Sequence, residues 1–258
     1  MPVSPKRMPF MSHLDELRKR LTVVIAVVGV FAIAGYVFSD QVFRLLTGPM
    51  IEYVGQATAI DLMEAMTNRF RLGIFAAVVV GSPVIIYEIL AFFLPALKPS
   101  ERRWFGWTFV AAALLFLAGV AMCYFLVLGR TTDWLVAQGG DLFQMMVTGK
   151  SMISFAMWFL VGFGLAFEVP VIIFYLVYFN VVPYAALRKN WRVVWVVMVV
   201  IASMITPDFS PVSMGALSVA MIALFEGSMF FVRLALARKI ARAENPIEDT
   251  EEIAEFED

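Results

Sequence analysis

The sequence predicts an all-α membrane protein with six transmembrane helices, and three observations carry this prediction. Hydrophobic residues make up 61% of the chain, against roughly 45–50% in soluble domains. Six apolar runs approach the ~20 residues that a helix needs to cross a bilayer. The runs are apolar on every face, whereas strands of a membrane barrel alternate over segments of about 10 residues. Helices are therefore the spanning structure that fits.

The expected helices lie at 21–38, 72–94, 104–128, 153–178, 193–205 and 212–232. The fifth run covers only about 20 Å at 1.5 Å per residue. Pro207 and Pro211 interrupt the chain after it, and Asp208 is placed to cap the next helix. We therefore expect helices five and six to be short and to leave one flank of the bundle low. Residues 1–242 form the transmembrane domain, and the acidic tail 243–258 is expected to be disordered in solvent.

The distribution of basic residues predicts the orientation of the chain. Lys and Arg accumulate in cytoplasmic loops. Five of the 20 basic residues fall in the loops assigned to the outer side, namely Arg44, Arg69, Arg71, Arg130 and Lys150. The prediction is a multi-pass protein of the cytoplasmic membrane with both termini in the cytoplasm. A cleaved signal at the first run is disfavoured, because the run is long and no small-residue cleavage pattern follows it.

Two outer loops are long enough to contain structure of their own. In the first, the polar stretch 61–68 is expected to form a short amphipathic cap over the bundle. In the second, residues 129–150 include Gly139 and Gly140, which indicate a turn between short helical pieces.

Glu168 lies deep in the apolar run from Met152 to Val182. An acid at membrane depth costs about 2.5 to 3.5 kcal/mol on insertion scales, so it persists beside a partner or a wet cavity. A functional intramembrane site is the preferred interpretation, and an acid paired only for packing is the alternative. Pro170 frees a backbone carbonyl and should bend the helix beside this carboxylate.

Glu226, in the sixth run, is a second embedded acid, for which an interhelical hydrogen bond is the simpler expectation. Two embedded acids leave open a proton-coupled secondary transporter that uses Glu168 and Glu226. The sequence has no internal repeat and no pair of broken helices in support of it. A third possibility is an assembly scaffold that binds no peptide.

The residues before the first run, 12–21, predict an amphipathic helix at the membrane interface. Ser12 is placed to cap it, and Leu14, Leu17 and Leu21 share one face. A membrane anchor and a docking site for a peptide fit this pattern equally well.

The loop between helices two and three contains Pro95, which ends a helix, and Ser100, which is placed to start the next. Glu101 is then a first-turn acid that favours the helix dipole. A binding role for Glu101 explains the same pattern equally well.

Catalytic chemistry is not indicated. His13 is the one histidine, and a triad or metal centre needs more ligands. Cys123 lies in an apolar run without a second cysteine, as expected of a buried, inert thiol. We therefore predict no enzyme activity, no metal and no cofactor.

Five motifs together resemble the TatC family, the receptor subunit of the twin-arginine protein translocase, over about the first 240 residues. They are the run from His13 to Arg18, Pro49 in the first outer loop, the loop with Phe92, Pro95 and Glu101 to Arg103, the run from Phe167 to Pro170, and Thr206 to Asp208 with Glu226 beyond. The resemblance implies a cup-shaped bundle of six helices. It also implies a cytoplasmic surface that receives the paired arginines of folded export substrates.

The resemblance also implies roles for individual residues. Glu101 is the principal acid that meets the arginine pair, Phe92 and Arg103 neighbour it, and Leu17 and Arg18 share in recognition. Glu168 is the acid that faces the concavity of the cup. The residues with structural or partner-binding roles are Pro49, Asp208 and Glu226.

The partners that the resemblance implies are single-span subunits of the TatA and TatB type, signal peptides, the lipid bilayer and further copies of the chain. One feature departs from the family. Many members have a glutamine shortly after the aspartate of the turn between helices five and six, where this chain has Pro211 and Val212. Partner docking around Asp208 is therefore left open.

Overall fold

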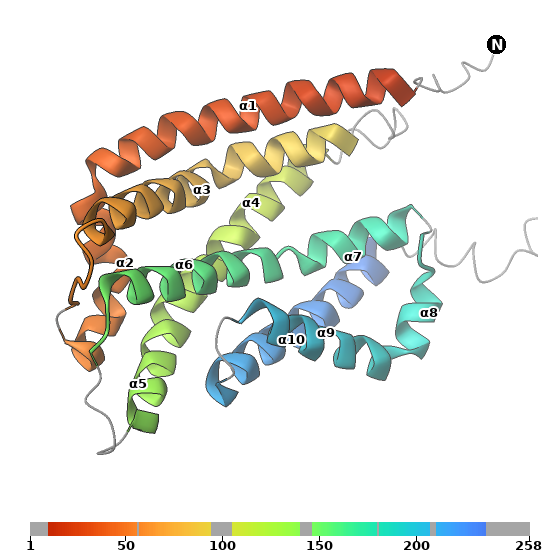
Figure 1. Ribbon diagram of the computed structural model, residues 1–258. Coiled ribbons are helices and arrows are strands. Elements are labelled where there is room, and N and C mark those ends of the chain that lie inside the picture. Colours follow the sequence, from red (N-terminus) through yellow and green to blue (C-terminus); the bar gives the residue numbers. More distant parts are fainter. Residues whose placement is uncertain are drawn as a thin grey trace, which may run out of the picture.

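The structure, a computed structural model, describes residues 10–55, 57–93, 105–139, 146–179, 181–206 and 210–235. In these residues it is helical, apart from turns and an isolated parallel bridge between Thr58 and Thr148 (Figure 1). The elements in order are α1 (Phe10–Val37), α2 (Ser39–Val54), α3 (Glu64–Phe93), α4 (Phe105–Met122), the π-helical turn η3 (Cys123–Val127), α5 (Leu128–Gly139), α6 (Gly149–Ala166), α7 (Val169–Tyr178), α8 (Tyr184–Lys189), α9 (Trp191–Ile205) and α10 (Pro211–Ala235).

The predicted all-α membrane architecture is confirmed. The described residues contain 5 helical stretches that are long and apolar enough to cross a bilayer: Leu14–Val37, Glu64–Phe92, Phe105–Gly139, Gly149–Tyr178 and Pro211–Leu234. The remaining apolar helix, α9, has 15 residues and covers about 22 Å. It is short, as the sequence predicts, so the structure does not establish a sixth complete crossing.

The sixth predicted helix is not short. α10 has 25 residues, about 37 Å of helix. Pro211 occupies its first turn, where a missing amide hydrogen costs nothing, and the helix continues beyond the apolar run through Arg233. Of the two predicted short helices, only α9 is short.

α1 and α3 form a separate layer of two long antiparallel helices on one side of the molecule (Figure 1). Their close approach depends on glycine. A Cβ atom on Gly73 would lie 2.7 Å from the carbonyl oxygen of Ala32, and one on Gly35 would lie 2.9 Å from the carbonyl oxygen of Gly73. Small residues that let two backbones meet are the usual basis of helix association in membranes.

α1 is one continuous helix of 28 residues, so the N-terminal motif is not a separate interfacial helix. Leu14, Leu17 and Leu21 share a face, as predicted, and this face is exposed. Few residues of α1 are buried, and the faces of α1 that do not pack on α3 are available to lipid or to a partner.

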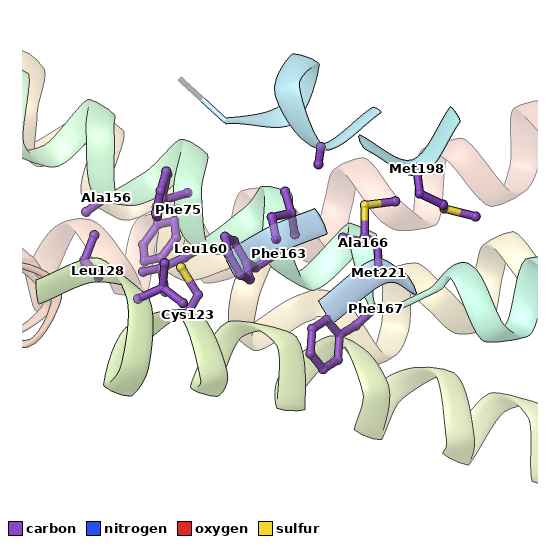
Figure 2. Close-up of a cluster of buried hydrophobic side chains, with 14 of the residues drawn as sticks. Phe75, Cys123, Leu128, Ala156, Leu160, Phe163, Ala166, Phe167, Met198 and Met221 are labelled. Carbon is purple, nitrogen blue, oxygen red and sulfur yellow. The ribbon is translucent and has the colours of Figure 1, made fainter. Parts of the chain in front are cut away.

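The core is centred on α6, which packs against α2, α3, α4, η3, α9 and α10. Phe159, Phe163 and Leu160 of α6 are almost fully buried. Figure 2 shows Leu160 and Phe163 among side chains from several other helices, with Phe75 and Cys123 nearby. Cys123 is buried and free, as expected from the sequence.

The bend predicted at Pro170 is confirmed. α6 ends at Ala166 and α7 begins at Val169, with Pro170 in its first turn. The amide of Glu168 bonds the carbonyl of Leu165 at 3.1 Å, a tightened turn that carries the chain across the break. The carboxylate of Glu168 thus projects from a discontinuity in the helix.

The predicted position of the outer cap is wrong. Residues 64–68 begin α3, and the helix that lies beside the bundle is α2, which contains Pro49. The start of α3 is fixed by Glu64, whose carboxylate accepts hydrogen bonds from the amide of Ile60 at 3.0 Å and the amide of Lys150 at 2.9 Å. These bonds tie the two outer connections together.

The short helical piece expected before Gly139 is present, and it is continuous with the preceding helix. α4 continues through η3 into α5 as far as Gly139. α5 is amphipathic and packs mainly on α2, and Thr132 bonds the carbonyl of Leu128 at 2.8 Å. This packing, which the polar sequence does not reveal, explains why the helix does not end at residue 128.

Replacing Gly73 with alanine should destabilise the α1–α3 layer, because the new methyl group would meet the backbone of Ala32, which has no freedom to withdraw. We expect a loss of about 1–3 kcal/mol of unfolding free energy, the usual cost of overpacking. Denaturant titration in detergent micelles measures it. Gly29→Ala is the matched control, since nothing lies within 4 Å of a Cβ there. Equal stability of the two variants would contradict this packing.

Candidate functional site

The N-terminal end of the bundle, where α1 begins and α3 ends, collects several of the sequence-predicted residues. Leu17 and Arg18 are exposed near the start of α1, and Phe92 is partly buried near the end of α3. α4 begins at the same end, because Tyr87 of α3 packs edge-on against Phe105 and Phe109 of α4, at ring centroid distances of 5.7 and 5.6 Å. The predicted recognition residues that the structure describes therefore share one end.

Glu101, Arg103 and Asp208 lie outside the described residues. The segment that contains Glu101 and Arg103 joins the end of α3 to the beginning of α4, both at the N-terminal end of the bundle (Figure 1). Their assigned roles remain predictions.

An ion-pair cluster joins α1 to α3 at this end. The guanidinium of Arg20 bonds the carboxylate of Glu16 through Nε at 3.0 Å and that of Glu88 through Nη1 at 2.9 Å. Glu88 is the more buried acid, with 14% of its side chain exposed. A cavity of about 540 Å³ adjoins the cluster and is also lined by Asp15 and Lys19.

Sequence reasoning missed this cluster. The i,i+4 spacing of Glu16 and Arg20 was a local signal for the first ion pair. The second pair joins residues 68 positions apart and becomes visible only when α1 and α3 are packed together. Glu88 of α3 therefore neutralises a positive charge on α1.

Glu168 lies on the wall of a long apolar groove. Its Oε1 atom is buried and has no hydrogen-bond partner within the described part of the chain. The groove has a volume of about 470 Å³ and lies between α3 and α4 on one side and α6 and α7 on the other. Its other polar lining residues are Ser82, which bonds the carbonyl of Val79 at 2.8 Å, and Tyr175, which bonds Thr108. Among these lining residues Glu168 alone carries a carboxylate.

The groove runs from Glu168 toward the N-terminal end of the bundle. The α3 residues that line it extend from Val78 to Leu90, so it ends within one turn of Phe92. On the opposite wall it extends along α7 to Val181. An apolar segment in this groove would have one end beside the exposed motifs and would pass along the embedded acid toward Val161 of α6.

Glu226 is held in an interhelical network, as the sequence suggested. Its carboxylate accepts a hydrogen bond from Arg188 of α8 at 2.9 Å and one from the indole of Trp195 of α9 at 3.3 Å. Both carboxylate oxygens are therefore bonded. The network fixes the short helices α8 and α9 on α10.

α2, which has Pro49 in its interior, lies at the end of the bundle opposite to the C-terminal end of α3 (Figure 1). We call the end with α2 the cap end. Arg69 joins α3 to α2 there through Asp40 at 3.0 Å and Ser39 at 3.2 Å. Pro49 and the recognition motifs thus occupy different ends of the molecule. The structure does not bring them into one site.

Within the described residues, no group of three or more His, Cys, Asp or Glu side chains is arranged to hold a metal ion. The chemistry that the arrangement supports is recognition. It combines exposed charged and apolar side chains at one end with an apolar groove and one incompletely paired acid.

Comparisons with known proteins identify the family. The family model described as "Sec-independent protein translocase protein (TatC)" matches residues 12–219. The Sec-independent protein translocase protein TatC of Carboxydothermus hydrogenoformans is 29% identical and covers 88% of this chain and 94% of its own length. The protein of the same name from Escherichia coli (strain K12) is 32% identical, with 92% of each chain covered.

A solved structure of a related protein agrees. The crystal structure of the "Twin Arginine Translocase Receptor- TatC in DDM" superposes with a TM-score of 0.73 at 27% identity, covering 85% of this chain and 98% of the other. The chain therefore belongs to the TatC family, the multi-spanning component of the Sec-independent, twin-arginine protein translocase, and it is a transport protein and not an enzyme.

Proposed function

We propose that this chain is the signal-peptide receptor of its translocase, with the binding surface at the N-terminal end of the bundle. The observation that best supports the proposal is the groove between this end and Glu168. The paired arginines of a signal peptide would bind among Leu17, Arg18, Phe92, Glu101 and Arg103. The apolar segment that follows them would lie in the groove.

The chemistry of arginine favours this arrangement. A guanidinium has a planar set of donors that a carboxylate meets with two parallel hydrogen bonds, and lysine does not reproduce this geometry. At the boundary between lipid and water, the effective dielectric is lower than in bulk water. The attraction between Glu101 and an arginine is therefore stronger there than at a fully solvated surface.

Glu168 would act as a polar acceptor inside the membrane. Its buried Oε1 atom has no partner in the described residues, and the groove gives an incoming helix access to it. A single-span subunit of the TatA or TatB type with a polar residue at matching depth would satisfy this oxygen. Such pairing lowers the cost of opening the bilayer to folded cargo.

The remaining parts of the proposal concern placement and assembly. The bias of Lys and Arg places both termini, and with them the binding surface, in the cytoplasm. The unburied faces of α1 leave room for contacts with the single-span subunits and with further copies of the chain. The comparisons give no support to a proton-coupled transporter, and Glu226, its second supposed carrier, is bonded at both oxygens.

Replacing Glu101 with alanine should weaken capture of a twin-arginine signal at least about tenfold, because a charge-assisted hydrogen-bond pair is lost. Glu101→Gln should retain little binding, since its amide has no negative charge. Photocrosslinking from residues 94–104 to a twin-arginine precursor measures the effect.

Glu52→Gln is the control for Glu101, because it removes an exposed acid from α2 at the cap end. Its crosslinking yield should equal that of the unmodified chain. Unchanged crosslinking in both Glu101 variants would refute the receptor role assigned to this residue.

Replacing Glu168 with alanine should reduce export of a folded reporter several-fold without weakening signal capture at the N-terminal end. Glu168→Gln should preserve more export than the alanine variant, because an amide still offers a hydrogen bond to a partner inside the membrane. Leu165→Ala, which trims the same groove without changing its polarity, is the matched control. Export at the unmodified rate by Glu168→Ala, at normal protein levels, would disprove the role.

A further inference from the structure

Pro49 leaves a backbone acceptor of α2 without its helical donor. The residue lies ten positions after the start of α2, so its nitrogen would normally donate to the carbonyl of Leu45. Proline has no amide hydrogen, and that bond is lost. The carbonyl of Leu45 must therefore find another donor.

Tyr124 supplies the donor from a different helix. Its hydroxyl donates to the carbonyl oxygen of Leu45 at 2.7 Å, across 79 positions of sequence. Glycine makes the approach possible on both sides. A Cβ on Gly48 would lie 3.3 Å from the Tyr124 hydroxyl, and one on Gly129 would lie 3.1 Å from the carbonyl oxygen of Pro49.

The π-helical turn η3 places Tyr124 at this contact. Up to its first residue, the buried positions fall on one helical face: Ala112, Phe116, Gly119 and Cys123. From its last residue onward, they are Val127, Leu128, Thr131 and Thr132. At 100° per residue, a regular helix would rotate most of the second set well away from the first. The extra residue of the π-turn absorbs this rotation, so one long helix packs on α6 and then on α2.

From these contacts we infer that Tyr124 is the residue that positions α2 at Pro49. The two residues act together. Pro49 leaves the carbonyl of Leu45 without a helical donor, and the hydroxyl of Tyr124 donates to this carbonyl and so joins α2 to η3. Neither residue has its full effect without the other. The inference concerns the cap end and does not depend on signal-peptide binding.

A double-mutant cycle tests the coupling. Tyr124→Phe alone should lower the equilibrium constant for folding, measured by denaturant titration in micelles, by a factor of about 3 to 10. In a Pro49→Ala background, the new amide at position 49 can bond the Leu45 carbonyl. The same tyrosine change should then cost less than about twofold.

Tyr36→Phe is the matched control, because Tyr36 packs on Phe70 through its ring and its hydroxyl makes no hydrogen bond among the described residues. It should leave the folding equilibrium unchanged in both backgrounds. Pro49→Ser restores the same amide and replaces Pro49→Ala if that variant does not fold. Equal effects of Tyr124→Phe with and without the proline, or no effect in either, would overturn the inference.

Discussion

A polar group inside a bilayer has no water to bond, and this constraint governs where the structure departs from regular helix. Pro49, in the interior of α2, and Pro170, in the first turn of α7, each lack a backbone donor. At Pro49 the missing donor is replaced by a tyrosine from another helix. At Pro170 the chain instead ends one helix and starts another, and the break carries an acid. The first proline is thus part of an interhelical contact, whereas the second lies beside the candidate site.

The helices differ in how fully their neighbours enclose them. α6 is enclosed by neighbouring helices and contains many of the buried side chains. α1 is held chiefly by α3, through the glycine contacts at Gly35 and Gly73 and the ion pairs of Arg20. Regions with few buried contacts are the ones that open at low free energy. The proposed receptor surface is therefore built on the less enclosed layer, where a peptide displaces lipid and little protein packing.

The sequence could predict whatever depends on local composition. Apolar runs located the spanning helices, the 13-residue run predicted a short α9, and Pro170 predicted the bend at Glu168. It did not place a helix at α2 or show that α5 continues from α4, because both segments are polar and are stabilised by packing on each other. Nor could it pair Arg20 with Glu88 or Tyr124 with Leu45, since those partners lie far apart along the chain. The position of Glu168 in an apolar run identified it as a candidate, but the groove beside it follows only from the arrangement of four helices.

The embedded acids show why burial alone does not identify a functional carboxylate. Glu88 and Glu226 lie on apolar helices, yet each is bonded to an arginine, and Glu226 also to a tryptophan. Glu64 is buried and holds two backbone amides. The fold itself supplies hydrogen-bond partners to these acids. The contacts that they make between helices therefore offset the free-energy cost of burying a carboxylate. Glu168 has the same side chain in a similar setting, but one buried oxygen has no such partner in the described residues, and it faces a groove that another helix can enter. The cost of burying that oxygen is therefore recovered only when something binds, which is the property that a receptor for a membrane-inserted partner requires.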